Sequence, residues 1–178
     1  DWNYSNLVLY NGTWYYVDHG RINWDYTGLT KYYSTWYMVV NGQLDWNFTN
    51  LTKYYGTWYY VENGKLNWNY TDLFQYFGTW YYIRGGVLDW NYTGLAYHAG
   101  SYYYINHGVL DWNYSGFAQI DGKGRYYEVV NGVMVYSALD KMRGLVRNET
   151  SPTNYIILVD RAAHRVGIFK GGKNNWQD

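Results

Sequence analysis

The chain has 178 residues with 14 basic side chains, 14 acidic side chains and no cysteine, and 24% of its residues are Phe, Trp or Tyr. Its balanced charge, without any block of like charge, does not favour binding to duplex nucleic acid or to an anionic membrane. The lack of cysteine excludes disulfides, zinc thiolates and a cysteine nucleophile from these residues, and no apolar run approaches the length of a membrane span.

Tryptophan recurs at a constant spacing of 22 residues through most of the chain. The members of this first ladder are Trp2, Trp24, Trp46, Trp68, Trp90 and Trp112. A second ladder runs in phase with the first and consists of Trp14, Trp36, Trp58 and Trp80, continued by Tyr102. A fixed period of this length predicts a short structural unit copied in tandem.

The third copy predicts a β-hairpin between Thr57 and Tyr70, with Asn63-Gly64 as a type I′ turn. The same corner recurs at His19-Gly20, Asn41-Gly42, Gly85-Gly86, His107-Gly108 and Asn131-Gly132. Counting outward from the turn predicts the pairs Glu62–Lys65, Val61–Leu66, Tyr60–Asn67 and Tyr59–Trp68.

This register predicts two faces for each hairpin, because side chains alternate across a strand. The expected core face holds Tyr59, Val61, Leu66, Trp68 and Tyr70. The expected outer face holds Trp58, Tyr60, Glu62, Lys65, Asn67 and Asn69. Apolar positions that repeat on the core face are Val17, Val39, Val61, Ile83, Ile105 and Val129, with the partners Ile22, Leu44, Leu66, Leu88, Leu110 and Met134. The connections between hairpins are expected to carry Leu7, Leu29, Leu51, Leu73, Leu95 and Phe117 as plugs between neighbours.

A single unit offers too few large apolar side chains to offset the entropy lost on ordering it. We therefore expect an all-β solenoid of about six stacked β-hairpin units over residues 1–136, in which each unit buries its core on the next. The last copy carries an insertion at Asp121–Gly124 and has Val135-Tyr136 in place of the expected Asp-Trp, which is typical of a terminal capping repeat.

The periodicity ends near Ser137, and we expect a second, incomplete domain over residues 137–178. Ser137 followed by Asp140 predicts the capping box of a short helix. The segments NYIILVD and RVGIFKG, separated by RAAH, predict a β-hairpin. Its expected buried face consists of Ile156, Leu158, Val166 and Ile168.

The string GTWYYVENGKLNWNYTDL resembles the aromatic cell-wall-binding repeats of Gram-positive surface proteins, relatives of the choline-binding modules. The resemblance implies a left-handed β-solenoid with choline headgroups held in aromatic cages between consecutive hairpins. By this resemblance, the second-ladder residues Trp14, Trp36, Trp58, Trp80 and Tyr102 match the first Trp of the family's Trp-Tyr-Tyr element. The family's Gly-Trp is here Gly28-Leu29 and its equivalents, so Trp24, Trp46, Trp68 and Trp90 would have to rebuild that cage wall.

The tail from Asn154 to Trp176 is similar to the opening of an L,D-transpeptidase catalytic domain of the YkuD type. Such domains use a later cysteine nucleophile, which these residues lack, so we expect no enzyme activity from them. We interpret the chain as a fragment of a longer protein.

The repeated aromatic residues suit two ligand classes, a quaternary ammonium bound by cation–π attraction and a sugar ring stacked on Trp or Tyr. Polar contacts to a sugar could come from Asn23, Asp45, Asn67, Asp89 and Asp111. The candidate binding residues are Trp14, Trp36, Trp58, Trp80, Tyr102, Tyr16, Tyr60, Tyr82, Trp24, Trp46, Trp68 and Trp90. Both ladders could instead only pack neighbouring hairpins, and this interpretation is favoured for the ladder of Trp24. The four histidines have no metal-ligand spacing, and no metal or cofactor is expected.

We expect a non-catalytic bacterial module that docks a secreted, wall-associated enzyme, an L,D-transpeptidase, onto cell-wall polymer. The expected partners are peptidoglycan glycan, or choline or teichoic-acid-like groups, with a monomeric chain and no nucleic acid. Several weak sites on a repeating polymer would raise avidity. The alternative is a structural spacer whose aromatic residues only pack the solenoid. A third hypothesis, a hydrolase using repeat carboxylates, would require an acidic pair in one repeat that the others lack, and none has one.

Overall fold

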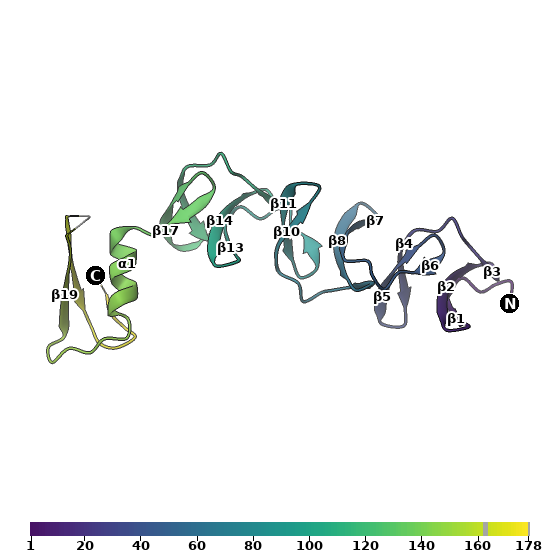
Figure 1. Ribbon diagram of the computed structural model, residues 1–178, viewed down its shortest axis with the longest axis horizontal. Helices are drawn as coiled ribbons and strands as arrows, with labels where there is room; N and C mark the ends of the chain where they lie inside the picture. Colours follow the sequence, from purple (N-terminus) through teal and green to yellow (C-terminus); the bar gives the residue numbers. More distant parts are fainter. Residues whose placement is uncertain (162–163, 178) are drawn as a thin grey trace.

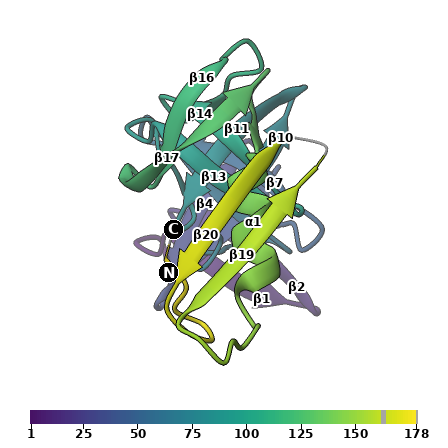
Figure 2. The same cartoon turned by 90° about the vertical axis from the view of Figure 1, so that its left-hand side faces the viewer.

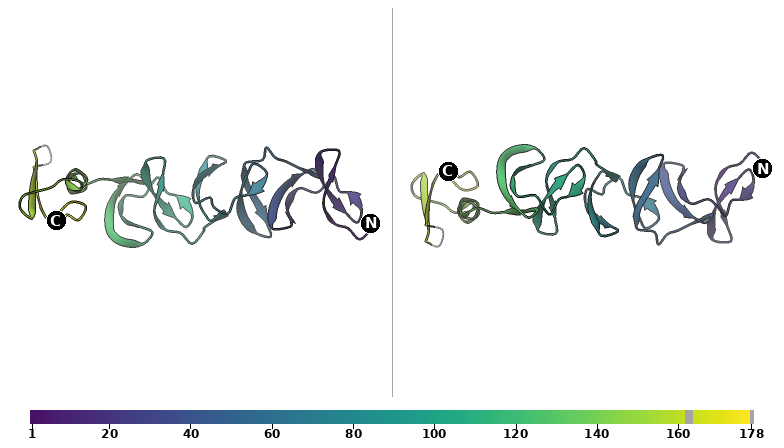
Figure 3. Two further views of the ribbon diagram at one scale, coloured as in Figure 1. Left: turned by 90° about the horizontal axis from the view of Figure 1, so that it is seen from below. Right: turned by 90° about the horizontal axis from the view of Figure 1, so that it is seen from above.

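The protein is an elongated array of small β-units that ends in a helix and a separate β-hairpin (Figure 1). The computed structural model describes residues 1–161 and 164–177. The units follow one another along the long axis in chain order, and the two termini lie toward opposite ends (Figure 3). The predicted all-β solenoid of repeated hairpins is confirmed. No helix within the described ranges is long and apolar enough to cross a membrane.

Each of the six units contains two longer strands and one short strand. The first strands are β1 (Asn6–Tyr10), β4 (Gly28–Tyr32), β7 (Asn50–Tyr54), β10 (Asp72–Tyr76), β13 (Gly94–His98) and β16 (Gly116–Ile120). The second strands are β2 (Thr13–Asp18), β5 (Thr35–Val40), β8 (Thr57–Glu62), β11 (Thr79–Arg84), β14 (Ser101–Asn106) and β17 (Lys123–Val130). The third strands are β3 (Arg21–Ile22), β6 (Gln43–Leu44), β9 (Lys65–Leu66), β12 (Val87–Leu88), β15 (Val109–Leu110) and β18 (Val133–Val135).

The main hairpin of each unit lies one strand earlier than the sequence analysis predicts. In the third unit it joins β7 to β8 around Tyr55-Gly56, and both turn residues have the positive φ that a type I′ turn requires. Leu51 therefore belongs to a strand and pairs with Tyr60, whereas it was expected in a connection. The missed signal is the Gly that recurs at the second turn position, as in Gly56 and Gly78.

The predicted turn at Asn63-Gly64 is confirmed, but it joins β8 only to the two-residue strand β9. Val61 pairs with Leu66, and Glu62 pairs with Lys65, as predicted. The predicted pair of Tyr59 with Trp68 is wrong, because Tyr59 pairs with Val87 of the next unit. The chain leaves the sheet after β9, since the side chain of Asn67 accepts a 2.9 Å hydrogen bond from the amide of Asn69 and starts a turn.

The units are joined by backbone hydrogen bonds between the glycine that precedes the third strand of one unit and the unit before it. At the junction of units 3 and 4, the amide of Tyr60 donates to the Gly86 carbonyl at 2.9 Å. The Gly86 amide in turn donates to the Tyr70 carbonyl at 2.9 Å. The same pair of bonds recurs at the other junctions between consecutive units, so neighbouring units share an interior.

The core is a row of small clusters, each built from two neighbouring units. Leu51 and Tyr60 of unit 3, for example, pack on Ile83 and Leu88 of unit 4. Nearly all of the repeated aliphatic positions predicted as core are buried, which confirms the period-22 pattern, whereas Trp68 of the predicted core face is 50% exposed. The exceptions among these aliphatic and plug positions are Ile22, in the first unit, and Phe117, in the last unit of the array.

The tail forms the predicted short helix α1 (Ala138–Val146), with Ser137 as N-cap and the Ser137–Asp140 capping box present. The strands β19 (Tyr155–Asp160) and β20 (Arg165–Lys170) form the predicted hairpin, and α1 lies between it and the array (Figures 1 and 2). Two residues of the turn predicted at RAAH, 162–163, lie outside the described residues.

The predicted buried face of this hairpin is wrong for β20. Ile156 stands opposite Phe169 and Leu158 stands opposite Gly167, and directly opposed residues share a face of an antiparallel pair. Phe169 is therefore the buried residue that packs on Met142 and Val146 of α1. Val166 and Ile168, expected inside, are exposed on the other face.

Candidate ligand-binding site

A cavity of about 160 Å³ lies between units 1 and 2, and five aromatic residues line it. Four of them, which we call cage 1, are Trp14, Tyr32, Tyr37 and Trp46, and the fifth is Tyr33. The ring centroids of Trp14 and Tyr32 are 5.1 Å apart, and those of Tyr37 and Trp46 are 5.9 Å apart. Both pairs have an edge-to-face arrangement, which leaves ring faces available to a ligand.

The second strand of a unit contributes rings to two cages, because its side chains alternate between the two faces of the strand. Trp58 and Tyr59 are adjacent in β8 and therefore point to opposite faces. Tyr59 pairs edge-to-face with Trp68 at 6.0 Å, whereas Trp58 meets Tyr76 of the next unit at 5.4 Å. The Trp and the first Tyr of each Trp-Tyr-Tyr element therefore contribute to two different junctions, one on either side of their unit.

The four-ring arrangement recurs at the next two junctions. Cage 2 consists of Trp36, Tyr54, Tyr59 and Trp68, and cage 3 consists of Trp58, Tyr76, Tyr81 and Trp90. The Trp36–Tyr54 and Tyr81–Trp90 centroid distances are 5.2 Å and 6.0 Å, close to those of cage 1.

The fourth junction replaces one tyrosine by a histidine. Cage 4 consists of Trp80, His98, Tyr103 and Trp112, with Trp80 and His98 4.9 Å apart. Asp72 holds the imidazole in place, because its Oδ1 lies 2.8 Å from Nδ1 of His98.

The fifth junction departs further from the pattern. Its corresponding residues are Tyr102, Ile120, Tyr127 and Tyr136, so one ring is lost. The guanidinium of Arg125 already lies 4.5 Å from the ring centroid of Tyr127.

The first-ladder tryptophans are not core residues, so their predicted place on the core face is wrong, although those from Trp24 onward contact a tyrosine ring edge-to-face. Trp46 and Trp68 are 46% and 50% exposed, and the other members are similarly half-exposed or more. The turn that follows each third strand carries these rings out of the sheet, beside the cavity. The second-ladder residues, in contrast, are half-buried against the core clusters.

The cage 1 cavity offers few polar groups apart from the tyrosine hydroxyls and Thr35. The carboxylates and carboxamides proposed as sugar contacts serve turns instead. Asp45, for example, accepts a 2.9 Å hydrogen bond from the amide of Asn47, and its counterparts make the same bond. No carboxylate or cationic side chain lines this cavity.

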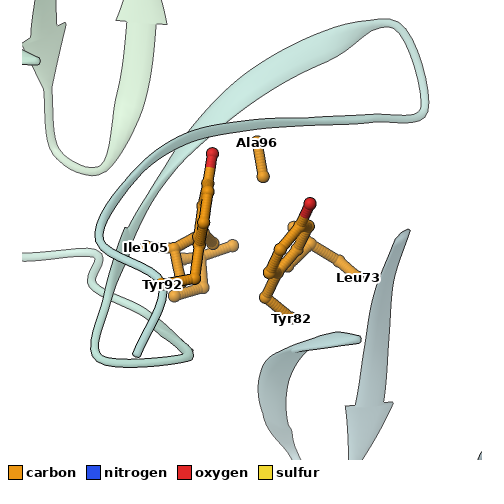
Figure 4. Close-up of a cluster of buried hydrophobic side chains, with 6 residues drawn as sticks. Leu73, Tyr82, Tyr92, Ala96 and Ile105 are labelled. Carbon is orange, nitrogen blue, oxygen red and sulfur yellow. The ribbon is translucent and has the colours of Figure 1, made fainter. Parts of the chain in front are cut away.

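The structure does not bring Tyr16, Tyr60 and Tyr82 to the cage 1 cavity. Their rings pack on those of Tyr26, Tyr70 and Tyr92 at centroid distances of 3.9–4.2 Å, inside the junctions. Figure 4 shows the pair Tyr82–Tyr92 beside Leu73, Ala96 and Ile105. Burial raises the pKa of the Tyr60 and Tyr70 hydroxyls.

Sequence reasoning missed two walls of the cages. They are the last residue of the first strand, which is Tyr32, Tyr54, Tyr76 or His98, and the second ring of the second strand, which is Tyr37, Tyr59, Tyr81 or Tyr103. Both series follow the 22-residue period. They were overlooked because the main hairpin was placed one strand too late, which put Tyr59 on the core face.

A profile of the choline-binding repeat matches residues 3–23, 25–45, 47–67, 69–89 and 91–111. These segments make up more than half of the chain, so the chain belongs to the choline-binding repeat family. The sixth unit lies outside the matched segments. No curated protein matches the chain.

Several solved structures are similar to the chain. The crystal structure of CbpF in complex with ipratropium is 27% identical, with a TM-score of 0.34, and the match covers 75% of this chain and 39% of that one. Choline binding protein F from Streptococcus pneumoniae, crystallised in the presence of a peptidoglycan analogue, is 25% identical, with a TM-score of 0.33 and coverage of 74% and 41%. The choline binding domain of Spr1274 in Streptococcus pneumoniae is 29% identical, with a TM-score of 0.30 and coverage of 48% and 94%. The chain thus spans about two fifths of the first two structures.

Proposed function

We propose that the array binds the quaternary ammonium of choline groups on bacterial cell-wall polymer, with cages 1 to 3 as its principal sites. The observation that carries this proposal is the convergence of Trp14, Tyr32, Tyr37 and Trp46 on one cavity. Its volume of about 160 Å³ corresponds to roughly five water molecules of liquid, which is adequate for a compact cationic headgroup.

The chemistry of the walls favours a cation over a sugar inside the cage. Facing aromatic rings attract a desolvated cation by about 2 kcal/mol or more per favourable contact. A sugar would leave several hydroxyls without partners in a cavity that has few polar groups. The protein already shows this attraction internally, since the ammonium of Lys65 lies 5.4 Å from the ring centroid of Trp46.

Binding of choline and of 3,3-dimethylbutan-1-ol, its neutral isostere, tests this function. Both ligands fill the same volume, but only choline carries the charge that the rings would recognise. Titration calorimetry with the whole chain is expected to show choline binding about tenfold tighter or more. Equal affinity for the two, or no binding of choline, would contradict the function and leave the spacer as the better explanation.

Avidity supports the docking of the chain on wall polymer. Several sites of weak affinity on one rod can engage a repeating polymer together, which raises retention without new contacts. This function places the protein outside the cell on the bacterial wall. We expect retention on purified choline-bearing walls to fall with each cage-forming unit removed, and retention independent of the number of units would contradict it.

The tail supports a second, finer proposal, that residues 137–178 open an L,D-transpeptidase domain carried by the array. The outer face of its two-stranded sheet exposes four apolar side chains, Ile157, Val159, Val166 and Ile168, each about 60% exposed. Such a face suits a sheet that is covered within a larger domain. An assay of peptidoglycan cross-linking by the full-length protein tests this proposal. Cross-linking should be abolished when the catalytic cysteine of that domain is replaced.

A further inference from the structure

Three turn tips of the array present large aromatic rings to solvent. Tyr33, Tyr55 and Phe77 each occupy the first turn position of a main hairpin and are 86%, 92% and 91% exposed. We call these three residues the rim. Hydrophobic burial does not explain rings that are so exposed.

The rim residues also sit in an unfavourable backbone conformation. Their φ values are 52°, 44° and 46°, in the left-handed region that Asn and Gly tolerate and bulky residues avoid. The first unit has Asn11 at the same position, with φ 48°. Neither packing nor turn geometry therefore accounts for an aromatic residue at this place.

Each rim ring lies against a tyrosine that belongs to a cage. Tyr33 lines the cage 1 cavity, and its ring meets that of Tyr32 edge-to-face at 4.6 Å. The equivalent distance is 4.5 Å for Tyr55 and also for Phe77, each to the cage tyrosine that precedes it in sequence. The rim thus extends the aromatic surface of the cages outward into solvent.

The rim accompanies only the three complete cages. The fifth unit has Ala99 at the turn tip, where the cage wall is His98, and the sixth has Asp121, where the wall position is Ile120. An exposed aromatic turn tip and a tyrosine wall therefore occur together or not at all in units 2 to 6.

We propose that the rim stacks on a sugar ring of the polymer that carries the bound choline group, an inference that rests on the proposed function. A ligand whose ammonium lies inside the cage must leave through its mouth, where the rim ring is the next surface it meets. The aliphatic face of a hexose packs on an aromatic ring without needing a hydroxyl partner. Phe77 fits this role, because it has a ring and no hydroxyl.

The test compares the whole chain with a double variant, Tyr55→Asn and Phe77→Asn, using free choline and a phosphocholine-substituted hexose oligosaccharide as probes. Tyr33 is left in place because it lines the cage 1 cavity itself. Asn suits the left-handed conformation, so the variant is expected to unfold at the same temperature or higher. Affinity for free choline should stay within about twofold, and affinity for the oligosaccharide should fall about fivefold or more. Phe117→Thr, which removes an exposed ring outside the turn tips, is the control and should change neither affinity.

The result separates the two proposals. If free choline does not bind the unmodified chain, the proposed function itself fails. If choline binds but the double variant retains full affinity for the oligosaccharide, the choline cages are retained and the rim proposal is overturned. Ala99→Tyr should conversely raise the affinity of cage 4 for the oligosaccharide and leave its affinity for free choline unchanged.

Discussion

Gly64 lies directly against Trp46 of the preceding unit: a Cβ on Gly64 would stand 3.0 Å from the Cα of Trp46 and 2.5 Å from the carbonyl oxygen of Asp45. The Gly64 amide also donates a 2.9 Å hydrogen bond to the carbonyl of Phe48. Because Trp46 is a wall of cage 1, one contact both joins units 2 and 3 and positions a binding residue. The same approach recurs at Gly20, Gly42, Gly86, Gly108 and Gly132.

Gly64→Ala is therefore expected to destabilise the array and to weaken cage 1. The added methyl group meets backbone atoms that cannot move away without shifting Trp46. The strain of a left-handed Ala plus overpacking should lower the free energy of unfolding by roughly 2–4 kcal/mol. Urea unfolding and choline titration measure the two effects.

Gly56→Ala is the matched control for this prediction. Gly56 also has a positive φ, 86°, but nothing lies within 4 Å of the added methyl group. It should cost about 1 kcal/mol and leave choline binding intact. Equal destabilisation by both substitutions would show that the close contact of Gly64 with the preceding unit does not contribute to the loss of stability.

The second prediction concerns a ring that walls a cage and a ring that does not. Trp58→Ala removes one wall of cage 3 and is expected to weaken choline binding there about tenfold. Tyr60→Phe, two residues further along the same strand, changes a residue buried inside the junction and should leave choline affinity unchanged. A loss of affinity in Tyr60→Phe would mean that the binding surface has been misplaced.

The period of the repeat predicted the fold, because tandem units, corner glycines and alternating core residues all follow from it. The period did not predict the strand boundaries. Tyr55-Gly56 and Asn63-Gly64 can both form two-residue turns, and only packing decides which of the two hairpins is long. The error moved Trp68 into the core, whereas the turn started by Asn67 carries it to the surface.

The cages could be predicted only in part for a related physical reason. Each cage combines residues up to 32 positions apart in sequence, as Trp14 and Trp46 are. Sequence periodicity identifies such residues as equivalent between units, but it does not tell which series meet at a junction. The stacking of the units decides this.

The third prediction exchanges the cage 2 tyrosine and the cage 4 histidine. His98→Tyr gives cage 4 the ring composition of the other cages and should raise its choline affinity several-fold, because a phenol ring offers a better cation-binding face than an imidazole. Tyr54→His should weaken cage 2 by a similar factor. The indole resonances of Trp80 and Trp36 report the two sites separately. Unchanged affinity in both variants would argue against ring faces as the source of binding.

The fourth prediction is a loss of stability at alkaline pH. Burial, and secondarily the nearby carboxylates of Asp72 and Asp121, raise the pKa of the Tyr70 and Tyr92 hydroxyls above the usual value of 10. These groups stay neutral in the folded chain and ionise in the unfolded chain above about pH 10. Their contribution is therefore complete below pH 10 and is lost as the pH rises toward the folded pKa.

Melting temperatures measured between pH 8 and pH 12 test this linkage. Tyr92→Phe removes a 2.6 Å hydrogen bond to the Leu95 carbonyl and should cost about 1 kcal/mol at pH 8. The same variant should lose less stability than the unmodified chain when the pH is raised. A melting temperature that is constant across this range would contradict the burial of these hydroxyls.

The most direct test of the cages is a choline titration followed by the indole N–H resonances of a ¹⁵N-labelled chain. The resonances of the six tryptophans that wall cages 1 to 3 should shift and saturate together with the bound choline, namely Trp14, Trp36, Trp46, Trp58, Trp68 and Trp90. Trp176, which packs in the tail against α1 and the β19–β20 hairpin, should not shift. Binding between the hairpins would be contradicted if the resonances of the cage indoles did not shift, or if the Trp176 resonance shifted as much as they do.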